Sequence, residues 1–325
     1  MRALRVLYVV VGLALLAAVF AEVEFADVWS HAVSIGIGGM VALVVLYGAA
    51  FLIDSFTWQM AMAGVPLNVR WLWRAFRVRM VGEVFNNVMP AAGMGGEPVK
   101  AILLNKHYGL GYREGTASII LGRTVNMVAQ VLFLAIGFAA IWTSDLPGQF
   151  KGLALAGLAI FVAVTALFFY AQRLRIASLA GSWLGRWRLL ERINEVLHHV
   201  QDMDERLIRF YTGNRGRFAV AVALAFLNWV AGAVEIYIAM IFLGHPISFV
   251  DAWIVESVAQ LIRTAVFFIP AALGAQEGAF LLVFTVMTGG PALGVAMALI
   301  RRARELVWLL LGAAFGAVYA ARPMA

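Results

Sequence analysis

Four ionisable residues interrupt stretches of sequence that are apolar enough to lie in a membrane. Glu97 and Glu277 each follow a proline and a run of small residues. An arginine then occurs in the next apolar stretch, Arg123 after 26 residues and Arg301 after 24. Ionisable groups inside membrane spans are costly and commonly functional. Because arginine binds phosphate through two parallel hydrogen bonds, this pattern predicts a site for a phosphate-bearing ligand near the membrane centre.

A structural role is the alternative for each of these charges. Each glutamate could satisfy the start of its own helix or pair with an arginine. Arg301 and Glu305 are spaced i,i+4, so they could form a salt bridge with each other. Lys100 follows Glu97 by one turn and could pair with it or meet an anion. The sequence leaves two roles open. The functional role is proton coupling or headgroup recognition, and the structural role is internal ion pairing.

Further polar residues lie close to the same stretches and are candidates for lining a cavity. Arg302 and Arg304 are on other faces of the helix that carries Arg301, and neither has an obvious partner in the sequence. The remaining candidates are Asn86, Asn87, Glu256, Arg263 and Gln276.

Two segments of similar composition, 90–97 and 270–277, are predicted to be broken helices. Proline lacks an amide hydrogen and clashes with the preceding turn, and glycine lets the backbone reverse. Broken backbone survives at membrane depth only when protein buries it or when it lines a wet cavity. Two breaks therefore predict a polar cavity between two halves of the chain. The predicted break residues are Pro90, Gly93, Gly95, Gly96, Pro270, Gly274 and Gly278.

The composition indicates a membrane protein with many spans. Of the 325 residues, 63% are hydrophobic and 13% are charged, whereas soluble domains have about 25% charged residues. Six stretches have the roughly 20 apolar residues that a span requires. They are 5–21, 33–53, 116–142, 150–171, 218–243 and 291–320. The broken segments 76–104 and 251–288 are predicted to be re-entrant helical hairpins.

Basic residues gather in alternate connections, and this gives an orientation. The positive-inside rule places both termini in the cytoplasm, with the first hairpin entering from inside and the second from outside. We therefore predict an all-α polytopic membrane protein with a single transmembrane domain, 1–325, that contains an inverted repeat. The repeat halves are about 33–142 and 218–321, and an amphipathic cytoplasmic segment, 172–217, lies between them.

Several kinds of chemistry have no visible machinery. The segment 93–100 is rich in glycine but lacks the Walker spacing and its hydroxyl residue. The five histidines are scattered, and there is no cysteine. We expect no metal, no cofactor and no enzymatic activity. The net charge of +7 is explained by the positive-inside bias, so we expect no nucleic-acid partner.

Two segments together resemble a known family. The segments 85–101 (FNNVMPAAGMGGEPVKA) and 269–279 (IPAALGAQEGA) are similar to the two signature hairpins of the lysylphosphatidylglycerol synthase transmembrane-region family, whose members are flippase-like. The resemblance runs from about Val41 to Tyr319, and 253–305 also resembles a branch associated with hopanoid biosynthesis. It implies a lipid-translocating domain. In bifunctional members this domain moves aminoacylated phosphatidylglycerol made by a cytosolic transferase domain, which we expect to be absent here.

The predicted function is lipid translocation across the bacterial inner membrane, passive or coupled to protons. The lipid would be an anionic phospholipid, a polyprenyl phosphate or a hopanoid-like lipid, with its headgroup near Glu97, Arg123, Glu277 and Arg301. Two alternatives remain: a secondary transporter of a small anionic solute, and a non-transporting partner of a lipid-biosynthetic enzyme. The lipid, the direction of transport and the oligomeric state are not predicted.

Overall fold

The chain folds as an all-α polytopic membrane protein, as the sequence predicted. The computed structural model describes residues 2–62, 64–89, 95–173, 215–266 and 269–321 of the 325. Within these ranges the secondary structure is helical, apart from turns and one 3-10 turn, η1 (Pro270–Ala272). The α-helices are α1 (Arg2–Ala21), α2 (Phe25–Ser34), α3 (Gly36–Ala61), α4 (Val69–Val88), α5 (Gly96–Tyr108), α6 (Tyr112–Thr143), α7 (Gly148–Arg173), α10 (Arg215–Phe242), α11 (Phe249–Ala265), α12 (Ala275–Thr288) and α13 (Pro291–Ala321).

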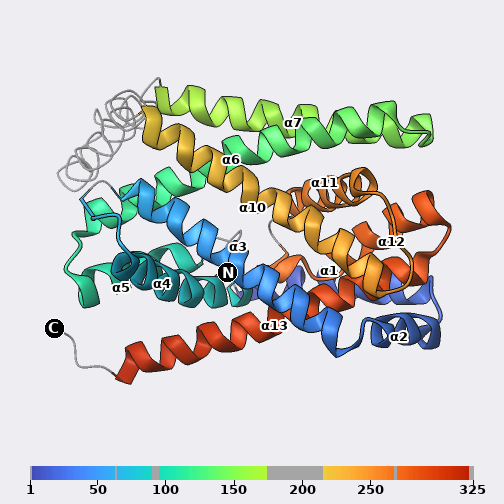
Figure 1. Ribbon diagram of the computed structural model, residues 1–325, viewed down its shortest axis with the longest axis horizontal. Helices are drawn as coiled ribbons and strands as arrows, with labels where there is room; N and C mark the ends of the chain where they lie inside the picture. Colours follow the sequence, from blue (N-terminus) through green and yellow to red (C-terminus); the bar gives the residue numbers. More distant parts are fainter. Residues whose placement is uncertain (1, 63, 90–94, 174–214, 267–268, 322–325) are drawn as a thin grey trace.

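Long helices run along the longest axis of the molecule (Figure 1). Six segments are long and apolar enough to cross a membrane: α3, α6, α10, α13, most of α7 and the segment Pro270–Thr288. The number matches the prediction, but one member differs. The predicted first span, 5–21, is not among the six; the described part of α1 qualifies only together with α2, across a bend of 91°. Two exposed glutamates, Glu22 and Glu24, lie at this bend.

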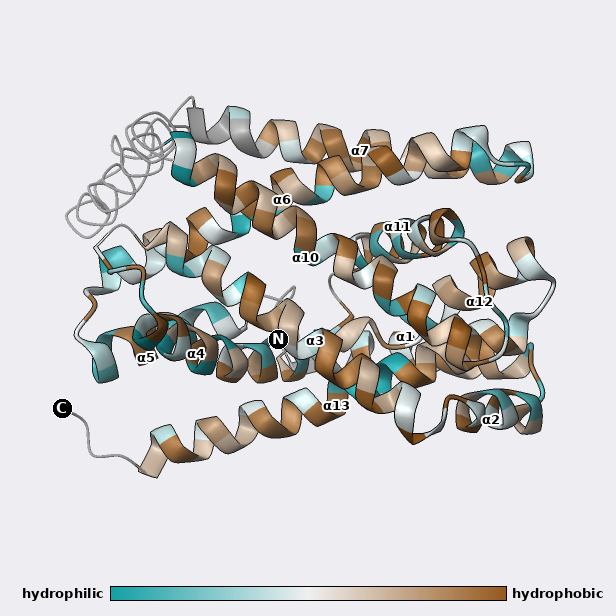
Figure 2. Cartoon of the chain, viewed as in Figure 1, coloured by the Kyte–Doolittle hydropathy of each residue, from teal (hydrophilic) through white to brown (hydrophobic). Residues whose placement is uncertain are grey.

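The outer surface of the helices is apolar. Figure 2 shows hydrophobic residues predominating along α7 and over much of α13. Leu153 on α7 is 75% exposed and Leu310 on α13 is 71% exposed. Apolar surface of this extent is stable only against another apolar phase, which the hydrocarbon of a bilayer provides.

Two helical hairpins lie at opposite ends of the long axis (Figure 1). The first is α4 with α5, and the second is α11 with α12; the helices of each pair pack against each other. Helix α5 has 13 residues and α12 has 14, which is about 20 Å of helix. This is too short to cross a hydrocarbon core of about 30 Å. On their own α5 and α12 are therefore too short to span, although α12 together with η1 forms the segment Pro270–Thr288 that is long enough. Re-entry of the two hairpins stays a prediction.

The first hairpin is held together by two glycines in direct contact. A side-chain carbon placed on Gly96 would lie 2.0 Å from the carbonyl oxygen of Gly82, which is sterically impossible. Two glycines thus allow α4 and α5 to approach each other at the level of the backbone. Gly95 precedes α5, and its own Cβ position is occupied by Met89.

The second hairpin is interrupted by strained backbone. After Pro270, two alanines adopt positive φ angles, 51° for Ala271 and 48° for Ala272, and Gly274 follows with φ 77°. Positive φ is unusual for residues with a side chain and is concentrated at functional sites. The interruption ends at Gly274. Gly278, which the sequence placed among the breaks, lies inside the continuous helix α12.

Central helices connect the two hairpins. Helix α10 packs on α3, α6 and α11, and α13 packs on both α12 and α4. The two hairpins also meet directly, because η1 contacts α4. The break residues Pro90 and Gly93, and most of the predicted amphipathic segment 172–217, lie outside the described residues. The boundaries of the two repeat halves stay a prediction.

Candidate functional site

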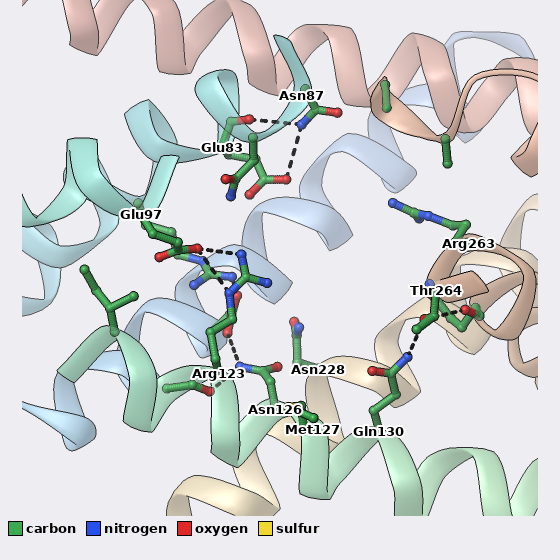
Figure 3. Close-up of a pocket in the computed structure, with 18 of the residues that line it drawn as sticks. Glu83, Asn87, Glu97, Arg123, Asn126, Met127, Gln130, Asn228, Arg263 and Thr264 are labelled. Atoms are coloured by element: carbon green, nitrogen blue, oxygen red, sulfur yellow. Dashed lines mark hydrogen bonds and ion pairs between the residues drawn. The ribbon is translucent and has the colours of Figure 1, made fainter. Parts of the chain in front are cut away.

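A polar cavity of about 470 Å³ lies where the two helix interruptions face each other. Its wall includes Asn86, Asn87 and Glu97 from the first hairpin, and Pro270 and Ala271 from the second. Helices α3, α6 and α10 complete it, so elements from both halves contribute (Figure 3). We call this space the central cavity. The exterior of the protein is apolar, and this cavity is therefore a polar compartment enclosed by membrane helices.

Glu97 is the most heavily paired carboxylate of the central cavity. Arg123 donates to its Oε1 from Nη2 at 2.5 Å and from Nε at 3.1 Å. Lys100 donates from Nζ at 3.1 Å. Lys100 is only 4% exposed, whereas the side chain of Arg123 is 48% exposed and faces the cavity. One carboxylate therefore serves two cations, one buried and one accessible.

The two asparagines that precede the first break have different roles. The Oδ1 of Asn86 accepts a hydrogen bond from the backbone N–H of Gly96 at 2.7 Å. This contact satisfies an otherwise unpaired donor at the start of α5 and connects α4 to α5. Asn87 donates to Glu83, at 3.0 Å to its carbonyl oxygen and 3.3 Å to its carboxylate. Both line the central cavity, where the sequence placed them.

The sequence analysis missed several polar residues of this cavity, among them Asp54, Arg79, Glu83 and Asn126. Asp54 forms an ion pair with Arg79 and accepts a hydrogen bond from Asn126 at 3.4 Å. Glu83 also lines the cavity. A sequence signal existed for Asp54, which is an aspartate near the end of a long apolar stretch. Glu83 lies inside the predicted hairpin 76–104, where a carboxylate was a sequence signal as well.

Glu277 lies at the equivalent position of the second hairpin, but outside the central cavity. Its Oε2 accepts from the backbone N–H of Gly274 at 2.8 Å and so caps the start of α12. Its Oε1 accepts from the Nε of Arg302 at 2.7 Å. Arg302 also donates to Glu305 at 3.3 Å. Gln276, beside it, is fully buried and makes no hydrogen bond through its amide to any described residue.

Arg301 and Arg304 form a separate buried charge cluster. Arg301 donates to Glu256 at 2.7 Å and to Glu235 at 3.1 Å, and Arg304 donates to Glu235 at 3.1 Å. All four side chains are at most 6% exposed. The guanidinium of Arg304 also lies 3.5 Å from the ring centroid of Tyr47. This cluster lines a second polar cavity of about 190 Å³.

The structure therefore divides the four principal residues of the sequence analysis between different places. Glu97 and Arg123 are paired at the central cavity, whereas Glu277 and Arg301 do not line it. The arginine that pairs with Glu277 is Arg302, 25 residues later. The sequence analysis treated Arg301 as the counterpart of Arg123, and the structure shows that this counterpart is Arg302 instead. The suggested pair of Arg301 with Glu305 does not form, because Glu305 accepts from Arg302 instead.

Arg263 connects the cavities. It lines the central cavity, the second cavity and a third, of about 30 Å³, which Glu83 and Glu305 also line. In Figure 3 its side chain points into the central cavity from the side opposite Arg123. Among the described residues, none forms a hydrogen bond or ion pair with the Arg263 side chain. Within the same part of the chain, no cluster of three or more histidines and carboxylates could hold a metal.

Comparison with known proteins agrees with this architecture. The family model described as "Lysylphosphatidylglycerol synthase TM region" matches residues 5–313. A UPF0104 membrane protein of Methanothermobacter thermautotrophicus is 23% identical over 276 residues, covering 80% of this chain and 78% of that protein. A UPF0104 membrane protein of Pyrococcus horikoshii is 23% identical over 273 residues, covering 80% of each. No solved structure matches the chain.

Proposed function

Because the chain belongs to the lysylphosphatidylglycerol synthase TM region family, we propose that it moves a phosphate-bearing membrane lipid between the two leaflets. The observation that carries this proposal is the central cavity, a polar space of about 470 Å³ between two broken hairpins in a protein with an apolar exterior. Binding sites of transporters commonly lie near the membrane centre between discontinuous helices of two halves.

The physical task of such a protein is to lower the cost of moving a polar headgroup through hydrocarbon. Burying an unpaired charge or polar group in an apolar phase costs several kcal/mol or more. In our proposal the headgroup enters the central cavity while the lipid tails remain in the bilayer. Arg123 is the accessible cation at its wall, and Asn86, Asn87 and Gln130 offer hydrogen bonds.

The remaining parts of the proposal follow the charge distribution and the family. We place the protein in the inner membrane with both termini in the cytoplasm, as the positive-inside rule requires. We propose a transport role rather than a catalytic one, since the family model describes a membrane region. Passive translocation and translocation coupled to protons through the buried carboxylates are both compatible with the cavity.

A vesicle assay tests the proposal. The full chain is reconstituted in liposomes that contain a trace of phospholipid with a fluorescent tail, and dithionite then bleaches the outer leaflet. Active protein should make nearly all of the fluorescence accessible, whereas empty liposomes protect about half. Arg123→Ala should slow this exchange at least about tenfold, because one charge-assisted contact contributes roughly 1.5–3 kcal/mol.

The matched control is Arg70→Ala, since Arg70 is exposed at the start of α4 and does not line the central cavity. It should leave the rate unchanged. Uptake of labelled glycerol phosphate without any lipid exchange would contradict the proposal and identify a transporter of small anionic solutes. If neither activity occurs and the protein copurifies with a lipid-biosynthetic enzyme, it is a non-transporting partner.

A further inference from the structure

Two arginines in the first half of α4 lie outside the three cavities described above. Arg74 and Arg77 are one turn apart and line none of these cavities. Among the described residues, the partners of both guanidinium groups are aromatic side chains, and neither group forms an ion pair with a carboxylate. This end of the molecule therefore carries two cations that the described chain does not neutralise.

Arg74 is held between two aromatic rings. Its Cζ lies 4.7 Å from the ring centroid of Trp71 and 5.0 Å from that of Tyr108. The face of a ring attracts a cation, but it does not replace the hydrogen-bond acceptors that the five N–H groups of a guanidinium can use. Arg74 donates no hydrogen bond to any residue that the structure describes. The rings thus fix its position and leave its donors available to an anion.

Arg77 approaches the same tyrosine at its hydroxyl group. Its Nη2 donates to the Oη of Tyr108 at 3.2 Å, and its Cζ lies 5.9 Å from the ring centroids of both Trp73 and Tyr319. The Nε of Arg77 is buried and donates to no atom of the described chain. Because a buried donor without an acceptor is costly, this nitrogen favours a ligand that brings an acceptor. Oxygen atoms of a phosphate match the planar fork of a guanidinium.

The two arginines converge because three helices meet here. Tyr108 is the last residue of α5, and Tyr319 is near the end of α13. Their hydroxyl groups share a hydrogen bond of 2.5 Å, although 211 residues separate them. Figure 1 shows α4, α5 and the C-terminal end of α13 in the same half of the molecule. A phosphate bound by Arg74 and Arg77 would therefore lie where the first hairpin meets the last helix.

The apolar surface of the protein leads directly to these arginines. The ring centroids of Trp73 and Phe315 are 6.0 Å apart, and Trp73 is 48% exposed. On α13, Leu311 and Val318 are exposed and lie on the same helix face as Phe315. Tryptophan is enriched at the boundary between hydrocarbon and headgroups. A lipid whose chains cover this face has its headgroup within reach of Arg77, which lies over Trp73. The surroundings thus favour a lipid over a soluble anion.

We propose that the first half of α4 and the ends of α5 and α13 form a binding site for an anionic phospholipid, whose phosphate is held by Arg74 and Arg77. This lipid stays bound to the protein and is distinct from any lipid that enters the central cavity. A zwitterionic phospholipid fits less well, because its cationic group would meet two arginines and no carboxylate of the described chain. The bound lipid stabilises the contact between the first hairpin and α13.

Thermal unfolding and lipid retention test the site. The full chain is washed free of lipid in mild detergent and mixed with micelles that contain phosphatidylglycerol or phosphatidylcholine. Phosphatidylglycerol should raise the unfolding temperature by at least about 2 °C more than phosphatidylcholine does, because a ligand that binds only the folded state stabilises it. The double variant Arg74→Gln/Arg77→Gln should bind phosphatidylglycerol at least about tenfold more weakly, measured by native mass spectrometry.

Three further variants separate this site from general charge effects, from the central cavity and from folding. The matched control is Arg70→Gln/Arg215→Gln, since both arginines are exposed and contact none of the site's rings among the described residues. It should retain phosphatidylglycerol as the wild type does. Arg123→Gln removes a cation of the central cavity and should also retain this lipid. Arg74→Gln alone breaks no hydrogen bond of the described chain, and it should weaken retention even if the double variant does not fold.

Three results would overturn the proposal. The first is equal retention of phosphatidylglycerol by the folded Arg74 variants and by the matched control. The second is equal stabilisation by phosphatidylglycerol and phosphatidylcholine, which would remove the selection for an anionic lipid. The third is stabilisation by inorganic phosphate alone that equals the effect of phosphatidylglycerol, which would identify a site for soluble anions. None of these measurements requires a lipid to cross the membrane, so the proposed translocation and this site can fail independently.

Discussion

Arg302 stands in the same relation to Glu277 as Arg123 does to Glu97. In each hairpin, a glutamate in the first turn of the second short helix accepts from an arginine on the helix that follows, at 2.7 Å for Arg302 Nε and 3.1 Å for Arg123 Nε. The surroundings differ. The side chain of Arg123 is 48% exposed, and that of Arg302 is 19% exposed beside a glutamate that is 2% exposed. Two equivalent ion pairs thus have different environments.

This difference predicts different effects on stability. Arg302→Gln removes the cation from the buried Glu277, and leaving a buried charge unpaired costs about 3–5 kcal/mol. We expect a fall in the unfolding temperature of several degrees in detergent, measured by differential scanning fluorimetry. Arg123→Gln serves as the matched control and should lower the unfolding temperature less, because Glu97 keeps its ion pair with Lys100 and the side chain of Arg123 is half exposed. An equal fall in the unfolding temperature of the two variants would contradict the proposed difference between the two ion pairs.

The contact between Gly82 and Gly96 predicts that the first hairpin tolerates no side chain there. Gly96→Ala should force α4 and α5 apart, because the new carbon would lie 2.0 Å from a carbonyl oxygen. Overpacking of this kind costs about 1–3 kcal/mol or more. Gly111→Ala is the control, since Gly111 has φ −56° and no atom within 4 Å of its Cβ position. Gel filtration and thermal unfolding compare the two, and a native-like Gly96→Ala protein would show that the contact relaxes freely.

The central cavity predicts a pattern of water accessibility along α6. The chain contains no cysteine, so a single introduced cysteine can be labelled without a background. Met127→Cys lies at the cavity wall and should react with a small water-soluble maleimide. Ala129→Cys, on the same helix but 0% exposed, should not react. Mass spectrometry after timed labelling measures both, and equal reactivity would argue against a wet cavity at this position.

The buried cluster predicts that Arg301 acts mainly in stability. Arg301→Met leaves Glu235 and Glu256 without one of their cations, so the unfolding temperature should fall strongly. Adding Glu256→Gln removes one of the unpaired charges and should recover part of the loss. The rate of lipid exchange by any folded variant should be unchanged, because Arg301 does not line the central cavity. A changed exchange rate with unchanged stability would assign Arg301 to the binding site.

The orientation can be tested with the same cysteine-free background. His245 is exposed in the connection between α10 and α11, and Arg70 is exposed at the start of α4. The positive-inside rule places the first outside and the second inside. In intact cells freed of outer membrane, an impermeant thiol reagent should label His245→Cys and not Arg70→Cys. The reverse result would invert the proposed topology.

Much of the fold was predictable because it depends on local signals. Apolar length predicts the spans, and proline with small residues predicts the two interruptions. Pairing of Glu97 with an arginine was one of the alternatives that the sequence left open, and the structure identifies this arginine as Arg123. The sequence did not decide whether Arg301 or Arg302 pairs with Glu277, because successive side chains of a helix point about 100° apart. The direction of a side chain depends on how α13 is rotated against α12, and an arginine at either position fits the apolar pattern.

Other site residues could not be assigned from the sequence because their partners lie far away along it. Glu235 and Arg301 are 66 residues apart, and Asn126 and Asp54 are 72 apart. A single carboxylate in an apolar helix indicates that a partner exists, but it does not identify that partner. Packing of α3, α6, α10 and α13 decides which charges meet.

The buried ion pairs of α13 also have a consequence for biogenesis. Arg301, Arg302, Arg304 and Glu305 all lie within five residues of one candidate span. Each arginine at the centre of an isolated span would cost about 2.5–3.5 kcal/mol during insertion. The carboxylates that offset this cost are on α10, α11 and α12, which the ribosome makes earlier. The carboxylates that pair with α13 are therefore already in the membrane when α13 inserts. A nascent chain that stopped before α13 would leave three buried carboxylates without their cations.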